Sequence, residues 1–234
     1  MATSVAINAR DNGGCTLPCY WGIEPGVTRW RDALDRLWDF SPYVITFQDA
    51  AFEGYSRGQL RSAKSYSLES VDLHGNLIAL SNYRVVDAVV DTIYVAPFAT
   101  AYLFDIGSVL ADYGEPTQAL VATYSDYFGD GVLTFWLLLY YPEVSTVLIY
   151  EKQAHKVDDR ISVCFNGNDG PTIHSWLIGD TRPLEALNLN IPLQRMRPLE
   201  EATALTIPDL RARYGSHRSW ACLESPASLW PPQD

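Results

Sequence analysis

Residues 132–141 read VLTFWLLLYY, and this stretch decides the fold class. It is apolar at nearly every position, so it lacks the alternation of a strand with one wet face. It is also about half as long as a transmembrane helix must be. A short apolar run that ends at the turn residues Pro142-Glu143 predicts a central strand in a sheet covered on both faces.

Other strand patterns surround this one. Ala119 to Tyr124 and Val144 to Glu151 would form a meander with it. A hairpin is predicted for Tyr66 to Leu73 and Leu77 to Tyr83, because His74-Gly75-Asn76 lies between them. Further strands are expected at 85–95, 161–165 and 172–178.

A helix is predicted after the turn Pro25-Gly26, with Thr28 as its cap candidate. Its apolar residues recur at helical spacing and are Trp30, Ala33, Leu34, Leu37 and Trp38. Both tryptophans are expected in the core rather than on a ligand platform.

Two shorter helices share one pattern of cap, apolar face and terminal Tyr-Gly. The first runs from Asp105 to Gly114 and the second from Thr206 to Gly215. The repetition indicates two related units, each a helix followed by strands. Together these elements predict an α+β fold, a mainly antiparallel sheet with a few short helices packed on it.

The expected organisation follows the chain in four segments. Residues 1–25 form an N-terminal disulfide segment, 26–100 and 101–220 form the two helix-plus-strands units, and 221–234 form a Pro-rich extended tail. The tail is expected to be anchored by Cys222 and Trp230.

The chain of 234 residues has 28 acidic and 17 basic side chains and a net charge of -11. No cluster of Lys and Arg is present that could neutralise several phosphates, so nucleic acid is not expected as a partner. No apolar run is long enough to predict a transmembrane segment.

Cys15, Cys19, Cys164 and Cys222 form an even set, for which three pairings are possible. Their spacing fits neither a C-x-x-C motif nor a zinc finger, which favours two disulfides over free buried thiols. Pro18 makes a tight turn plausible between Cys15 and Cys19. We therefore favour that pair, which leaves Cys164 with Cys222.

Paired cysteines indicate an extracytoplasmic location, either secreted or at the cell surface. Residues 1–14 lack the basic and apolar regions of a signal peptide, so the signal segment is expected to be absent from this sequence. Gly14 before Cys15 would also fit a lipid anchor. However, no apolar run precedes it, and a Cys15 paired with Cys19 cannot be acylated.

Three segments of the sequence carry a recognisable likeness. They are Cys15-Thr-Leu-Pro-Cys19-Tyr-Trp-Gly-Ile-Glu-Pro-Gly-Val-Thr28, Tyr113-Gly-Glu-Pro116 and Cys222-Leu-Glu-Ser-Pro-Ala-Ser-Leu-Trp230. They resemble an uncharacterised family of secreted or lipoprotein-type proteins from Chloroflexota-like bacteria. This resemblance implies a location and no activity.

A more distant resemblance rests on Gly26-Val-Thr28 at the start of a helix and on Tyr113-Gly-Glu-Pro116. These marks are similar to those of small outer-membrane assembly lipoproteins and β-lactamase-inhibitor proteins. That resemblance implies helices on an antiparallel sheet and a binding role.

The common motifs of nucleophilic, phosphate-binding and zinc enzymes do not occur in the sequence, so no cofactor is expected. Among the histidines, His174 has the most catalytic promise, since an imidazole near Asp169 or Asp180 could act as a base. A structural histidine is the favoured alternative. Asn166, Asn168 and Asp169, and the pair Asp126 and Asp130, offer oxygen ligands at spacings that miss a calcium loop, so no metal site is expected.

The segment from Tyr124 to Gly131 is the main candidate for binding, because it places aromatic and acidic residues at an expected hairpin tip. The candidate residues are Tyr124, Tyr127, Phe128 and Asp130. Such tips are typical of protein or sugar recognition, although these rings could also cap the core.

The favoured hypothesis is a non-enzymatic extracytoplasmic binding or scaffold protein. Its partner is expected to be another envelope or cell-surface protein, with carbohydrate as a variant. The alternative is a small extracytoplasmic hydrolase that uses His174.

Overall fold

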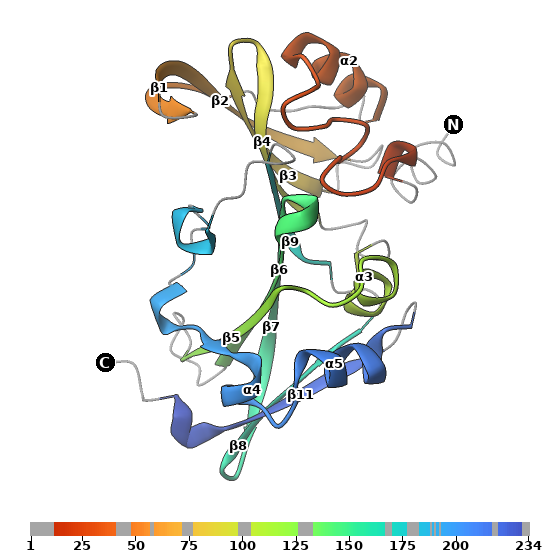
Figure 1. Cartoon of the computed structure of the whole chain (residues 1–234), viewed down its shortest axis with the longest axis vertical. Helices are drawn as coiled ribbons and strands as arrows, with labels where there is room; N and C mark the ends of the chain where they lie inside the picture. Colours follow the sequence, from red (N-terminus) through yellow and green to blue (C-terminus); the bar gives the residue numbers. More distant parts are fainter. Residues whose placement is uncertain are drawn as a thin grey trace. The chain divides into compact units, whose positions relative to one another are not determined.

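The computed structural model describes residues 12–40, 48–56, 59–71, 77–97, 104–125, 133–166, 170–176, 183–187, 189, 191, 193–216 and 220–230. These residues form two compact units, each built on antiparallel strands with short helices (Figure 1). The predicted α+β class is therefore confirmed. None of the helices in these ranges combines the length and the apolar character needed to cross a membrane.

The two units do not follow the order of the chain. The first contains the described residues up to Pro97 together with 142–146 and 172–176. The second contains the described residues of 104–141 and 147–171 and those from Pro183 onward. The predicted segments were linear, whereas two late pieces of the chain belong to the first unit.

The first unit contains one antiparallel sheet. Its strands, in spatial order, are β1 (Gln48–Ser56), β2 (Gln59–Val71), β3 (Leu77–Val86), β4 (Val89–Pro97) and β9 (Thr172–Trp176). The pairing of β2 with β3 confirms the predicted hairpin, whose turn lies outside the described residues. β1 was not predicted.

The prediction of one strand over 85–95 was wrong, because the chain reverses within it. Asp87 and Ala88 form the turn between β3 and β4, with φ values of 51° and 63°. A two-residue hairpin turn of type I′ needs left-handed backbone at both central positions, and Asn-Gly or Asp-Gly is its usual signal. Because Ala88 stands where Gly is usual, the sequence does not predict this turn.

Helix α2 (Trp30–Phe40) confirms the predicted amphipathic helix. Ala33 and Leu37 are buried, and Trp30 stacks on Tyr66 with 4.2 Å between ring centroids. Trp38 was wrongly assigned to the core, since its side chain is 49% exposed. At 100° per residue it lies about 100° around the helix from Leu37, at the edge of the buried stripe.

Strands β5 (Gln118–Ser125), β6 (Leu133–Tyr141) and β7 (Thr146–Val157) are neighbours in that order, which confirms the predicted meander. The 3-10 helix η3 (Pro142–Val144) connects β6 to β7 at the predicted turn. In the second unit, every residue from Leu137 to Tyr141 is buried, so this part of β6 is covered on both faces as expected.

The end of the chain is a strand and not the predicted extended tail. β11 (Ala221–Pro226) pairs with β8 (Arg160–Phe165), which also pairs with β7. Trp230 anchors the end as expected, since its Nε1 donates to the Ser225 hydroxyl at 2.7 Å. The strand signal of β11 is weak because the strand is short and ends at Pro226.

Helices α3 (Ile106–Asp112) and α5 (Ile207–Tyr214) contact each other in the second unit. Both predicted caps are confirmed: Asp105 accepts from the Gly107 and Ser108 amides, and Thr206 forms a capping box with Asp209. The remaining short elements are α4 (Leu199–Ala202), β10 (Arg197–Pro198), η1 (Asn12–Gly14), η4 (Leu184–Ala186), η5 (Leu193–Arg195) and η6 (Ala227–Leu229).

Candidate functional site

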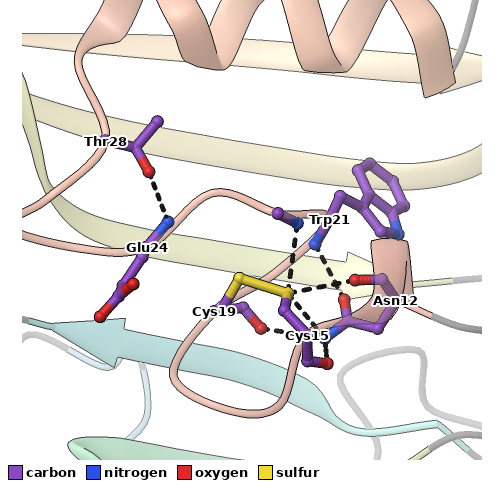
Figure 2. The surroundings of a disulfide bond; sticks show 7 residues. Asn12, Cys15, Cys19, Trp21, Glu24 and Thr28 are labelled. Carbon is purple, nitrogen blue, oxygen red and sulfur yellow. Dashed lines mark hydrogen bonds between the residues drawn. A yellow bond between two sulfur atoms is a disulfide. The ribbon is translucent and has the colours of Figure 1, made fainter.

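The N-terminal disulfide joins Cys15 to Cys19, as predicted, and Asn12 organises the loop that it closes (Figure 2). The Asn12 Nδ2 donates to the carbonyl oxygens of Cys15 and Cys19 at 2.8 and 2.9 Å. Its Oδ1 accepts from the Trp21 amide at 2.9 Å. This buried side chain links both ends of the disulfide loop to the backbone of Trp21.

The side chains that follow the disulfide loop, up to Thr28, also have structural roles. Tyr20 and Ile23 are fully buried and form an isolated β-bridge, and the Trp21 side chain is buried as well. The Thr28 hydroxyl accepts from the Glu24 amide at 2.8 Å, so it closes a turn instead of serving as the predicted cap of α2 (Figure 2). The segment is therefore a structural element and presents little for a ligand.

The second disulfide joins Cys164 on β8 to Cys222 on β11, which are directly opposite in register. Both predicted pairings are confirmed, and all four cysteines are used. Cys15 consequently has no thiol available for acylation.

His174 lies on β9 opposite Tyr94 of β4, with 4.5 Å between the ring centroids. The imidazole is buried, with only 7% of the residue exposed, and burial lowers its pKa to about 4. Its Nε2 meets no hydrogen-bond partner within the described ranges. His174 is thus a neutral and weakly basic group at neutral pH, which suits a structural histidine better than a general base.

Most of the acids proposed beside His174 and of the proposed cation ligands lie outside the part of the chain that the structure describes. Asp169, Asp180, Asp126, Asp130 and Asn168 lie outside the described residues. Among the residues that are described, no group of three His, Cys, Asp or Glu side chains could hold a metal ion.

The candidate binding segment begins on β5, and Tyr124 is the one of its four candidate residues that lies in the described part of the chain. Tyr127, Phe128 and Asp130 lie outside it. Tyr124 is half-buried and packs against Trp136 of β6, with 4.6 Å between the ring centroids and 45° between the ring planes.

The pairing register explains why these rings meet. Ala122 faces Trp136 and Tyr124 faces Thr134 across the β5–β6 pair, so all four side chains lie on one face of the sheet. The opposite face carries fully buried Val121 and Phe135. Tyr124, Thr134 and Trp136 are only half-buried, which makes this the less covered face of the hairpin.

Arg195 completes the cluster from η5. Its guanidinium carbon lies 5.9 Å from the centre of the Tyr124 ring, within the range of a cation–π interaction. The Arg195 side chain is exposed. We call Tyr124, Thr134, Trp136 and Arg195 the β5–β6 aromatic site.

Two polar atoms of this site are buried without a partner. The Tyr124 hydroxyl and the Trp136 Nε1 are inaccessible to solvent and form no hydrogen bond with any described residue. Burial raises the pKa of Tyr124, and the charge of Arg195 offsets part of that rise. Buried Tyr O–H and Trp N–H groups usually have partners, so these two unmet groups require an explanation.

Sequence reasoning identified Tyr124 and missed Trp136 and Arg195. Trp136 was concealed because the whole of 132–141 was interpreted as core. Arg195 lies about 70 residues from Tyr124 in a segment without strong periodicity, and only the pairing of β10 with β5 brings that segment near.

Comparisons with protein families, curated proteins and solved structures found no match to this chain.

Proposed function

We propose that this chain is a non-enzymatic extracytoplasmic protein that binds another envelope or cell-surface protein through the β5–β6 aromatic site. The observation that carries the proposal is the cluster of the half-buried Tyr124 and Trp136 rings with the exposed Arg195. A partner chain would bury the part of these side chains that is still accessible to water.

The composition of the site supports a protein partner. Trp, Tyr and Arg are the residues most enriched among interface positions that contribute strongly to binding. Here one of each lies in a single cluster, and Tyr124 contacts both of the others. The Tyr124 and Trp136 rings can bury apolar area against a partner, while the Arg195 guanidinium can form several directed hydrogen bonds.

The extracytoplasmic address is supported by the two disulfides, since such bonds persist in oxidising compartments and are rare in the cytosol. The resemblance of residues 15–28 to secreted and lipoprotein-type proteins points the same way. The hydrolase alternative has less support, because its candidate base His174 has a pKa of about 4.

The proposal is tested by capturing partners from a solubilised envelope fraction with the wild-type chain and with matched variants. Trp136→Ala and Arg195→Gln change the site. Trp220→Ala and Arg211→Gln are controls, since both are exposed residues of the same unit outside the site. We expect one saturable partner that the controls retain and the site variants lose. A partner retained equally by all variants would exclude this site, and the lack of any saturable partner would exclude the function.

A further inference from the structure

The disulfide between Cys164 and Cys222 lies on the face of the β8–β11 pair that is open to water. Side chains alternate between the two faces along each strand. The exposed Cys222 and the half-buried Cys164 share one face with the exposed ion pair of Arg160 and Glu224. The other face is the buried one, and it carries Ile161, Val163, Phe165, Leu223 and Ser225. The bridge is therefore placed where a dissolved reagent can reach it.

The line of attack on Cys222 also leads to an open strand edge. In thiol–disulfide exchange a thiolate attacks one sulfur in line with the S–S bond, and the other sulfur leaves. In the described part of the chain, β8 is the one strand that pairs with β11. The S–S bond crosses from β8 to β11, so its extension beyond Cys222 leads away from β8. The Tyr214 hydroxyl donates to the Cys222 carbonyl at 2.8 Å, which engages the backbone of this edge.

The disulfide between Cys15 and Cys19 has a different environment. Cys19 is buried, and Cys15 is half-buried. The Cys15 Sγ also accepts hydrogen bonds from the Gly22 amide at 3.2 Å and from the Asn12 Nδ2 at 3.6 Å. Neither sulfur of this bridge is as open to a thiolate as that of Cys222, so the two disulfides should differ in reactivity.

We propose that the Cys164–Cys222 bridge is a thiol–disulfide exchange site that reacts with an external dithiol at the Cys222 sulfur. A thiolate of the dithiol forms a bond to the Cys222 Sγ, the S–S bond breaks, and Cys164 leaves as a thiolate that takes a proton from water. The second thiolate of the reagent then displaces Cys222, which leaves in the same way. The dithiol is oxidised to a disulfide, and the two cysteines gain the two electrons.

Exchange at this site changes how firmly the end of the chain is held. The bridge is the covalent link between β11 and β8. After reduction, β11 is held by its ladder with β8 and by side-chain contacts such as the exposed ion pair of Arg160 with Glu224. Such exposed pairs contribute little stability, so the β11 amides should exchange with solvent faster in the reduced chain.

The test measures the reduction of each disulfide in the whole folded chain with increasing excesses of dithiothreitol. Samples are quenched with acid and alkylated, and peptide mass spectrometry gives the thiol content at each cysteine. We expect Cys164 and Cys222 to be reduced together, about tenfold or more faster than Cys15 and Cys19. Their rate should be proportional to the dithiothreitol concentration and nearly independent of urea below the unfolding transition, because no opening of the fold is required.

Glutathione, a monothiol, identifies the attacked sulfur, and its adduct is expected on Cys222 with a free thiol at Cys164. Equal or faster reduction of Cys15 and Cys19 would overturn the proposal. So would reduction of Cys164 and Cys222 that accelerates steeply with urea, because the bridge would then react only after the fold opens. A glutathione adduct on Cys164 would overturn the assignment of the attacked atom, and unchanged amide exchange in β11 after reduction would overturn the effect on the strand.

Discussion

The guanidinium of Arg195 lies 5.9 Å from the centre of the Tyr124 ring, and the same ring packs against Trp136. Two residues of the paired strands β5 and β6 and one residue from the distant segment η5 are thus combined into one cluster on the less covered face of β5 and β6. The other candidate side chains in the described part of the chain, such as the cysteines and His174, have structural roles. The proposed function therefore depends on this cluster.

Arg195→Gln should raise the pKa of Tyr124 further. Burial already raises that pKa, and the substitution removes the positive charge that offsets part of the rise. The measurement is a ¹³C NMR titration of the Tyr124 Cζ from neutral to high pH. Arg211→Gln is the reciprocal control, because Arg211 lowers the pKa of Tyr141 and should affect that residue instead. An unchanged Tyr124 titration in Arg195→Gln would show that the two side chains do not interact in solution.

His174 should make the folded state sensitive to acid. Its pKa is about 4 when folded and 6.5 when unfolded, so the unfolded chain binds more protons between these values. The stability contributed by neutral His174 is complete above pH 6.5 and is lost as the pH falls toward 4, to a total of about 3 kcal/mol at about 1.4 kcal/mol per pH unit.

This prediction is checked by urea unfolding at several values of pH for the wild type and His174→Gln. The variant should lose that part of the pH dependence, while His155→Gln, an exposed residue of β7, should retain it. Parallel curves for wild type and His174→Gln would be incompatible with a buried neutral imidazole.

Asp105→Ala should destabilise the chain more than Thr206→Ala, although both remove a helix cap. Asp105 is fully buried and accepts from the Gly107 amide and from the amide and hydroxyl of Ser108, at 3.0, 3.1 and 2.6 Å. Its removal leaves these donors buried without an acceptor and should lower the free energy of unfolding by about 2 kcal/mol or more. Thr206 is exposed, so its loss should cost about 1 kcal/mol. Equal midpoints in urea for the two variants would contradict this ranking.

The disulfide between Cys164 and Cys222 should contribute more stability than the one between Cys15 and Cys19. Their sequence separations are 58 and 4, and the chain-entropy estimate gives about 4 and about 2 kcal/mol. The comparison uses urea unfolding of the two double Cys→Ala variants. If removal of the Cys15–Cys19 disulfide caused the larger loss of unfolding free energy, chain entropy would not be the main source of the stability that the disulfides contribute.

The elements predicted from sequence are those whose signals are local. The caps at Asp105 and Thr206 and the apolar run at 132–141 specify their structures through nearby residues alone. Pro18 between Cys15 and Cys19 was sufficient to select the pairing that the structure contains.

The features that were missed depend on residues far apart in sequence. β11 is a strand because β8 pairs with it, although Pro226 weakens its own signal. The Asp87-Ala88 turn is stabilised by the pairing of β3 and β4 on either side of it. Likewise, the aromatic site required Arg195, whose position near Tyr124 no local pattern indicates.

The most direct test of the binding claim is site-specific crosslinking in the source cell envelope. Gln194 is exposed and adjacent to Arg195, so Gln194→p-benzoylphenylalanine places a photoreactive group beside the site without removing any of its members. Lys156 is an exposed residue of β7 in the same unit, and Lys156→p-benzoylphenylalanine is the matched control. We predict one discrete crosslinked protein from position 194 and none from position 156. No adduct at position 194, or the same adducts from both positions, would contradict a partner interface at Tyr124, Trp136 and Arg195.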